Sequence, residues 1–241
     1  MVEEDYTIVI EDVYKAYVTS SVVTWALLGV NLRVRRGDFI SVMGPSGSGK
    51  TTLLNLVGLI DRPTKGKIYI DGVDTSVLGD RELAEFRNRK IGFVFQTFNL
   101  ISRLNILENI ELPLIARGIP REERWRRALE ALLKVGGDES WIYKRPNQLS
   151  GGQQQRVAIA RAIVGSPSIL LADEPTGNLD TASARVVVKT FVELNKLGQT
   201  IVLITHNPEV AHCSQEIHVL RDGQIVNTLK SDSSRCLIYS K

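Results

Sequence analysis

The sequence predicts an α/β fold, and three patterns along its 241 residues support this prediction. The first part contains short alternating strands, the middle is mostly helical, and the last third alternates apolar strands with helices. With 43% hydrophobic residues, a chain of this length can bury one core and still accommodate an inserted subdomain. We therefore expect a mainly parallel sheet that carries an N-terminal antiparallel β-subdomain and an inserted helical subdomain.

The first part of the chain, about residues 1–96, reads as strand-rich and antiparallel. Strands are expected over Thr7–Val13, over 32–36, where side chains alternate in polarity, and over Phe39–Met43. Residues 66–74 read as a strand that runs into a turn at Asp71 and Gly72.

The middle, about residues 97–165, reads as helical. One expected helix has a single apolar face and ends at Gly136-Gly137. A second begins at Asn105, where Glu108 three residues later completes a capping box. The residues expected on the apolar face are Trp125, Ala128, Leu129, Leu132 and Leu133.

The last third, about residues 166–230, alternates strand and helix. The apolar runs Ile169–Ala172 and Ile201–Ile204 have the pattern of strands that are buried on both faces of a parallel sheet. We assign residues 1–230 to one domain. The polar tail, residues 231–241, is expected to be mobile or peripheral.

Composition excludes several classes of protein. A net charge of +3, from 30 basic and 27 acidic residues, gives no reason to expect a nucleic-acid partner. Cys213 and Cys236 do not have metal-ligand spacing, and we expect both to be free thiols in a cytosolic protein. The start is too acidic for a signal peptide, and the apolar run Val22–Val30 is too short to span a membrane. Any role at a membrane would therefore need a partner.

Gly44–Thr51 matches the phosphate-binding pattern G-x-x-x-x-G-K-T without a mismatch. The segment follows an apolar strand and precedes a helical run over 52–59, which is the context that this motif requires. Its glycines let backbone N–H groups point at the phosphates. Lys50 supplies positive charge there, and the hydroxyl of Thr51 can bind Mg²⁺.

Two of the expected parallel strands end in chemically active side chains. Asp173 and Glu174 end one strand, so Asp173 is placed to hold Mg²⁺ and Glu174 to polarise the attacking water. His206 follows another strand and could bind the γ-phosphate and keep the water and Glu174 in line. The alternatives are structural: the acids could cap the turn at Pro175, and a histidine after a strand is commonly structural.

Gln96 ends a further strand and begins the helical middle. Its carbonyl could reach Mg²⁺ or its water, and the residue could report the γ-phosphate to the helices. The alternative is that Gln96 only binds loop backbone.

Leu149–Gln153 is a second glycine-rich segment at the start of a helix, over 154–164. It has no lysine, and Ser150 with Gln153 is already a capping box, so a plain helix start explains much of it. The two glycines, however, destabilise the first turn unless a phosphate approaches the backbone closely. One complete and one incomplete phosphate cradle predict an ATP site that two molecules share.

Together these segments resemble the nucleotide-binding domain of ATP-binding cassette (ABC) transporters, over about residues 6–230. The resemblance implies a P-loop NTPase (RecA-like) core, the cofactors ATP and Mg²⁺, and ATP hydrolysis. It assigns catalysis to Lys50, Glu174 and His206, and metal binding to Thr51, Gln96 and Asp173. The nucleotide-binding residues that it implies are Tyr17, Gly44, Pro45, Ser46, Gly47, Ser48, Gly49, Lys50, Thr51, Thr52, Gln96, Ser150, Gly151, Gly152, Gln153 and Asp180.

Residues 93–100 and 146–156 are most similar to one branch of this family. That branch holds the lipoprotein-releasing, macrolide-exporting and cell-division ATPases. The resemblance implies a head-to-tail homodimer that closes on ATP. It also implies an integral-membrane subunit that docks near Gln96–Leu107, where Leu100, Ile101 and Leu104 are candidate contacts. We would then expect the chain in the cytoplasm, peripheral on the inner face of the cell membrane.

Three other functions remain open from the sequence. A cell-division type of ATPase would act mechanically on a membrane protein without moving a substrate. A DNA-maintenance ATPase would need long coiled coils between the two glycine-rich segments, and the helices expected there are short. A small P-loop kinase would have no use for Leu149–Gln153 or His206.

Overall fold

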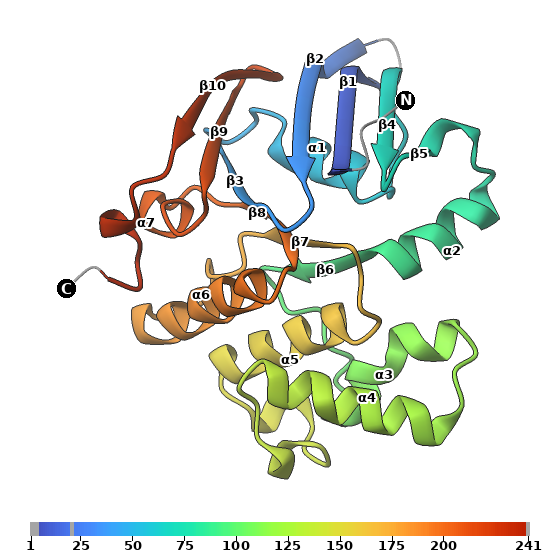
Figure 1. The fold of residues 1–241 in the computed structure, drawn as a ribbon, viewed down its shortest axis with the longest axis vertical. Helices are drawn as coiled ribbons and strands as arrows, with labels where there is room; N and C mark the ends of the chain where they lie inside the picture. The colour runs from blue at the N-terminus through green and yellow to red at the C-terminus, as the bar shows by residue number, and fades with distance from the viewer. Residues whose placement is uncertain (1–4, 20–21, 240–241) are drawn as a thin grey trace.

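The computed structural model describes residues 5–19 and 22–239. An antiparallel sheet in the order β2-β1-β4-β5 forms one side of the molecule (Figure 1). Leu32 and Val34 point into its core while Arg33 and Arg35 are exposed, as the alternation predicts. The strands of this sheet are β1 (Tyr6–Thr19), β2 (Val22–Arg35), β4 (Lys65–Ile70) and β5 (Val73–Asp74).

A second sheet, in the order β10-β9-β3-β8-β7-β6, runs through the middle of the molecule. All neighbouring pairs are parallel except β9 with β10. Its central strands are buried, as predicted from their apolar runs, so their carboxyl ends meet at one edge. The strands are β3 (Phe39–Met43), β6 (Ile91–Phe95), β7 (Ile169–Asp173), β8 (Thr200–Ile204), β9 (Glu216–Arg221) and β10 (Gln224–Lys230).

The helices fall into two groups. Figure 1 shows α3, α4 and α5 gathered on the side of the central sheet away from the antiparallel sheet. The remaining helices cover or connect strands of the two sheets. The helices are α1 (Lys50–Val57), α2 (Asp80–Lys90), α3 (Ile106–Ala116), α4 (Arg121–Lys134), α5 (Gly151–Ile163), α6 (Thr181–Lys196) and α7 (Pro208–Ala211), with short 3-10 turns at Thr75–Val77, Glu139–Trp141, Pro146–Gln148 and Ser233–Arg235. The predicted fold class, an α/β fold with a mainly parallel sheet, an antiparallel sheet and helices between its strands, is confirmed.

Local signals placed the start of α3 and the end of α4 correctly. Asn105 accepts a hydrogen bond from the N–H of Glu108, and the Glu108 carboxylate accepts one from the N–H of Asn105. After α4, Gly136 N–H donates to Leu133 and Gly137 N–H donates to Leu132. This pair of bonds is a Schellman cap, and it uses the positive φ of Gly136.

The buried face of α4 differs from the predicted one. Ala128 and Leu132 are fully buried, but Trp125 is 38% exposed and Leu133 is 50% exposed. Ala131, which the sequence pattern did not select, is buried. The prediction was wrong at these positions because the neighbours α3 and α5 determine which side of α4 is covered, and the periodicity of the sequence does not reveal where those helices lie.

One prediction about the C-terminal part, that of two free thiols, was also wrong. Cys213 and Cys236 form a disulfide, with Cα atoms 4.6 Å apart, so they are not free thiols. Cys236 and Leu237 are buried, and Leu237 N–H donates to the carbonyl of Glu209 in α7. The tail is therefore packed against α7 over these residues, because its two apolar side chains and the disulfide hold it there.

Candidate active site

The phosphate-binding loop leaves the central sheet at the end of β3 and enters α1. Two of its glycines have no room for a side chain. A Cβ at Gly44 would lie 2.1 Å from the carbonyl oxygen of Leu220, and one at Gly49 would lie 2.5 Å from that of Ala26. Gly49 also has a φ of 103°, which favours glycine. Strands β9 and β2 therefore pack directly against the loop, and the loop glycines line the cavity.

Lys50, the first residue of α1, points back across this loop. Its Nζ donates to the carbonyl oxygens of Gly44 and Pro45, at 2.8 Å each. The ammonium group is thus held at the mouth of the loop, where it can bind the oxygens of a phosphate chain.

Asp173 and Glu174 lie at the carboxyl end of β7, as predicted. Glu174 has a φ of 45°, and its N–H donates to Ile204 at the end of β8. A non-glycine residue in this conformation is strained, which is common where a side chain must point into a functional site. The Glu174 carboxylate lies 2.8 Å from Nδ1 of His206. The His206 side chain is mostly exposed and the Glu174 side chain is mostly buried, so the pair extends from the buried edge of the sheet to the solvent.

The pKa of Asp173 is raised. Burial is the main cause, the neighbouring Glu174 charge adds to it, and Lys50 opposes it. The folded protein therefore resists a negative charge at this position unless a cation is close.

This observation predicts opposite effects of Asp173→Asn on stability and activity. A carboxyl whose folded pKa is raised stabilises the fold when protonated, and that contribution is lost as the pH rises through the raised pKa. At neutral pH the neutral amide should therefore raise the midpoint of thermal unfolding of the nucleotide-free protein, while ATP hydrolysis falls about 100-fold.

Calorimetry and phosphate release measure the two effects. Asp138→Asn is the matched control. The hydrogen bond from Ser140 lowers the pKa of the Asp138 carboxyl, so the midpoint of thermal unfolding of this variant should not rise. An unchanged or lower midpoint for Asp173→Asn would contradict the role of burial.

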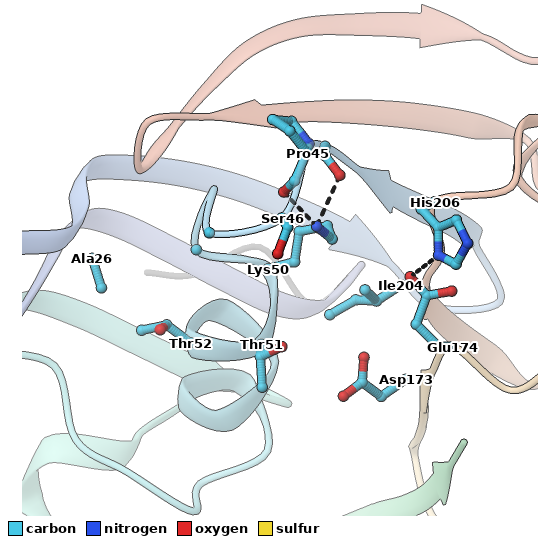
Figure 2. A pocket seen from close by; sticks show the side chains of 13 residues that line it. Ala26, Pro45, Ser46, Lys50, Thr51, Thr52, Asp173, Glu174, Ile204 and His206 are labelled. Carbon is cyan, nitrogen blue, oxygen red and sulfur yellow. Dashed lines mark hydrogen bonds and ion pairs between the residues drawn. The ribbon is translucent and has the colours of Figure 1, made fainter. Parts of the chain in front are cut away.

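These groups line one cavity of about 580 Å³. Figure 2 shows Asp173, Glu174 and His206 at one end of it and Ala26 and Thr52 at the other. The sequence did not single out Ala26 or Ile204, because neither carries a functional group. The predicted site residues that line the cavity are Gly44, Pro45, Ser46, Gly47, Gly49, Lys50, Thr51, Thr52, Asp173, Glu174 and His206.

Other predicted residues lie outside the lining. Ser48 is buried under the loop, and its Oγ has no hydrogen-bond partner within the described chain. Tyr17, on β1, is 39% exposed and donates from its hydroxyl to Asp61. Gln96 donates from Nε2 to Oδ1 of Asn178 at 3.0 Å, so its amide is joined to the loop after β7.

The second glycine-rich segment is a helix start at which Ser150 is exposed and Gly151–Gln153 are half-buried. Ser150 caps α5: it accepts from the N–H of Gln153 and donates its own N–H to the Gln153 side chain, which confirms the capping box. A Cβ at Gly152 would lie 2.9 Å from Cβ of Ser183 in α6, so packing alone requires this glycine. Asp180, also predicted to bind nucleotide, caps α6 by accepting from Ser183, and its pKa is lowered by that bond.

Ser150–Gln153, all within the described part of the chain, do not line the 580 Å³ cavity. Within one molecule the two glycine-rich segments therefore do not form one site.

Comparisons with known proteins show to which family the chain is similar. The family model described as ABC transporter matches residues 27–177. An uncharacterized ABC transporter ATP-binding protein of Thermotoga maritima is 54% identical over 215 residues, which cover 89% of this chain and 91% of that protein. The lipoprotein-releasing system ATP-binding protein LolD of Aquifex aeolicus is 44% identical, covering 84% of this chain and 90% of LolD.

Among solved structures, the chain is similar to the ATP-binding cassette MJ0796 of Methanocaldococcus jannaschii. That structure is a dimer in a post-hydrolysis state bound to ADP and Pi. The TM-score is 0.85 at 46% identity, and the match covers 93% of this chain and 99% of the other.

Proposed function

Because this chain belongs to the ABC transporter family and is one of its ATP-binding subunits, we propose that it hydrolyses ATP at two composite sites of a head-to-tail homodimer. Closure and opening of that dimer would drive a membrane-embedded partner. The observation that carries the proposal is the contrast between two segments: Gly44–Thr52 lies at one cavity with Asp173, Glu174 and His206, whereas Ser150–Gln153 lies outside that cavity, with Ser150 exposed and the other three residues half-buried.

The loop and the charged side chains of the cavity have distinct roles in this proposal. Lys50 and the N–H groups of the loop bind the β- and γ-phosphates and offset their charge. Glu174 orients the attacking water and accepts its proton at a carboxylate oxygen. His206 holds Glu174 by donating from Nδ1 across the 2.8 Å contact, and in the form with a proton on each ring nitrogen it also donates to the γ-phosphate from Nε2.

The residues around Asp173 fit a magnesium ion. Carboxylate, hydroxyl and amide oxygens are the ligands that Mg²⁺ prefers, and a buried Asp173 with a raised pKa is the kind of group that a cation would stabilise. Asp173, Thr51 and Gln96 would hold the ion, which would neutralise negative charge on the phosphates when bound.

The start of α5, with its exposed cap Ser150, would supply further phosphate-binding groups to the cavity of a second chain. Its N-terminal N–H groups and the Ser150 hydroxyl would meet the γ-phosphate bound to a second copy of the chain. Nucleotide would then favour the closed dimer because it contacts both chains only in that state. Hydrolysis removes one of those contacts, so the dimer would reopen. The two largest consequences of this arrangement are argued in the Discussion.

A groove beside the Gln96 segment is suited to the membrane partner. Its volume is about 490 Å³, and it lies between α2, β6, α3 and α5. Phe93, Phe95 and Pro113 give it an apolar lining, and Arg161 donates to Phe98 so that the segment after β6 is tied to α5. No helix within residues 5–19 and 22–239 is long and apolar enough to cross a bilayer. We propose that a cytoplasmic helix of an integral-membrane subunit docks in this groove and holds the chain on the inner face of the cell membrane.

Ala116→Glu tests this docking. Ala116 lines the groove and is exposed, so a glutamate there should not disturb the core. A docked helix would bury its charge, and the cost of that burial would oppose docking. We expect the variant to leave the membrane fraction of its native cells, while hydrolysis by the isolated chain stays within about twofold of the wild type. Val77→Glu, at a 74% exposed position outside the groove, is the matched control and should remain with the membranes. Equal membrane retention of both variants would show that the groove is not the docking site.

A further inference from the structure

The segment that follows α1 is bound to β1 by backbone and side-chain hydrogen bonds. Thr64 N–H donates to the carbonyl of Tyr14 at 2.8 Å, and Ala16 N–H donates to the Thr64 hydroxyl at 3.0 Å. Lys15 Nζ donates to the carbonyl of Arg62 at 2.9 Å. These bonds hold residues 61–64 against the part of β1 that carries Tyr17.

Asp61 is the central residue of this connection. Its Oδ1 accepts from Lys15 Nζ at 2.7 Å, and its Oδ2 accepts from the Tyr17 hydroxyl at 3.2 Å. Burial is the largest single influence and raises the pKa of Asp61, but the hydrogen bonds from Lys15, from the Arg62 N–H and from Tyr17, together with the charge of Lys15, hold the pKa below its usual value. The carboxylate therefore stays ionised at neutral pH and accepts from both side chains at once.

Asp61 is also fixed to α1. The N–H groups of Ile60 and Asp61 both donate to the carbonyl of Asn55, in the last turns of the helix that begins with Lys50. One short helix thus connects the phosphate-binding loop at its start with the carboxylate that holds Tyr17 at its end.

Lys15 covers one face of the Tyr17 ring. Its Nζ lies 5.0 Å from the ring centroid, and its side chain is only 12% exposed, whereas Tyr17 is 39% exposed. The ring is therefore supported from one side and open to solvent. The β1 backbone just before Tyr17 lies beside the cavity, because the cavity-lining Ala26 bulges from β2 between Trp25, which pairs with Ala16, and Leu27, which pairs with Lys15.

We infer that Asp61 and Lys15 are positioning residues that hold the Tyr17 ring for stacking on the purine base of ATP. This inference rests on the proposed function, in which the loop binds the phosphates. Asp61 fixes the ring relative to α1, so the distance between the base site and the phosphate site is set by one rigid helix. A ring already held in place loses less conformational entropy on stacking, which favours the complete nucleotide over a bare phosphate chain.

Isothermal titration with two ligands tests the inference: Mg-ATP, which has a base, and Mg-tripolyphosphate, which has none. We expect Asp61→Ala to weaken binding of Mg-ATP about fivefold and to leave binding of Mg-tripolyphosphate unchanged. Asp74→Ala is the matched control. Asp74 is an ion-paired aspartate in the sheet that carries Tyr17, but it does not touch Tyr17, so the variant should change neither affinity. Equal weakening of both ligands, or no weakening of ATP, would overturn the inference.

A double-mutant cycle separates positioning from a general effect on the fold. Tyr17→Phe removes the hydroxyl that Asp61 holds but keeps the ring. If Asp61 acts through that hydroxyl, the affinity of the double variant for ATP matches that of Asp61→Ala. Losses that simply add would overturn the inference. Lys50→Ala tests the premise separately: it should abolish binding of both ligands, and retained tripolyphosphate binding in that variant would instead count against the proposed function.

Discussion

Replacing Glu174 with glutamine is expected to slow ATP hydrolysis about 1000-fold while ATP binding is retained. The amide has the same shape as the carboxylate and can keep the contact with Nδ1 of His206, which is 2.8 Å in the wild type. It cannot accept a proton from the attacking water. The phosphate-binding groups around Lys50 are unchanged, so binding of the nucleotide does not depend on this carboxylate.

The same substitution is expected to trap a dimer. With hydrolysis blocked, ATP continues to contact both chains, and the closed state persists. Analytical ultracentrifugation of Glu174→Gln with saturating Mg-ATP should show a dimer, and the same sample with ADP should show a monomer. Glu193→Gln, which only breaks an exposed pair with Lys196 on α6, is the control and should behave like the wild type. A Glu174→Gln protein that binds Mg-ATP but stays monomeric would rule out the shared site.

The second large effect is expected from a charge at the start of α5. Ser150 both caps this helix and, in our proposal, meets the γ-phosphate of the other chain. Aspartate is as good a cap as serine, so Ser150→Asp should leave the helix folded, but its charge would repel the phosphate. We expect hydrolysis to fall about 100-fold, because one close charge at the transferred phosphate outweighs the donors around it. Ser150→Asn is the matched control, because asparagine is a neutral helix cap of the same size as aspartate, and it should lose far less hydrolysis activity.

Mixing two inactive variants tests which chain supplies each part. A Lys50→Ala chain lacks the complete cradle, and a Ser150→Asp chain lacks the second. In a mixed head-to-tail dimer one site carries both defects and the other carries neither. Random pairing of equal amounts makes half of the dimers mixed, so about a quarter of the wild-type activity should return. A mixture that stays as inactive as its components would contradict sites built from two chains.

Much of the candidate site could be predicted from the sequence because its signals are local. The run from Gly44 to Thr51 carries its own loop geometry, and the capping boxes at Asn105 and Ser150 each involve residues three apart. Apolar strands that end in Asp173 and His206 predicted that these side chains would meet at one sheet edge. The structure brings both into one cavity with the loop.

Other features depend on contacts that no local pattern encodes. The spacing of Cys213 and Cys236 indicated free thiols, but the fold places α7 beside the tail and the two cysteines form a disulfide. Gly152 suggested a close phosphate, and the structure adds a packing reason, because Ser183 of α6 lies where its side chain would be.

The sequence by itself determined which residues we propose to bind phosphate, hold a cation and activate water, and in which order strands and helices carry them. Only the tertiary structure decided the distances and pairings between those residues. These include the contact of Glu174 with His206, the hydrogen bond of Asp61 with Tyr17, and the position of Ser150 outside the cavity. The reason is physical: loop and cap geometry follows from a few neighbouring residues, whereas long-range contacts depend on how whole helices and sheets pack.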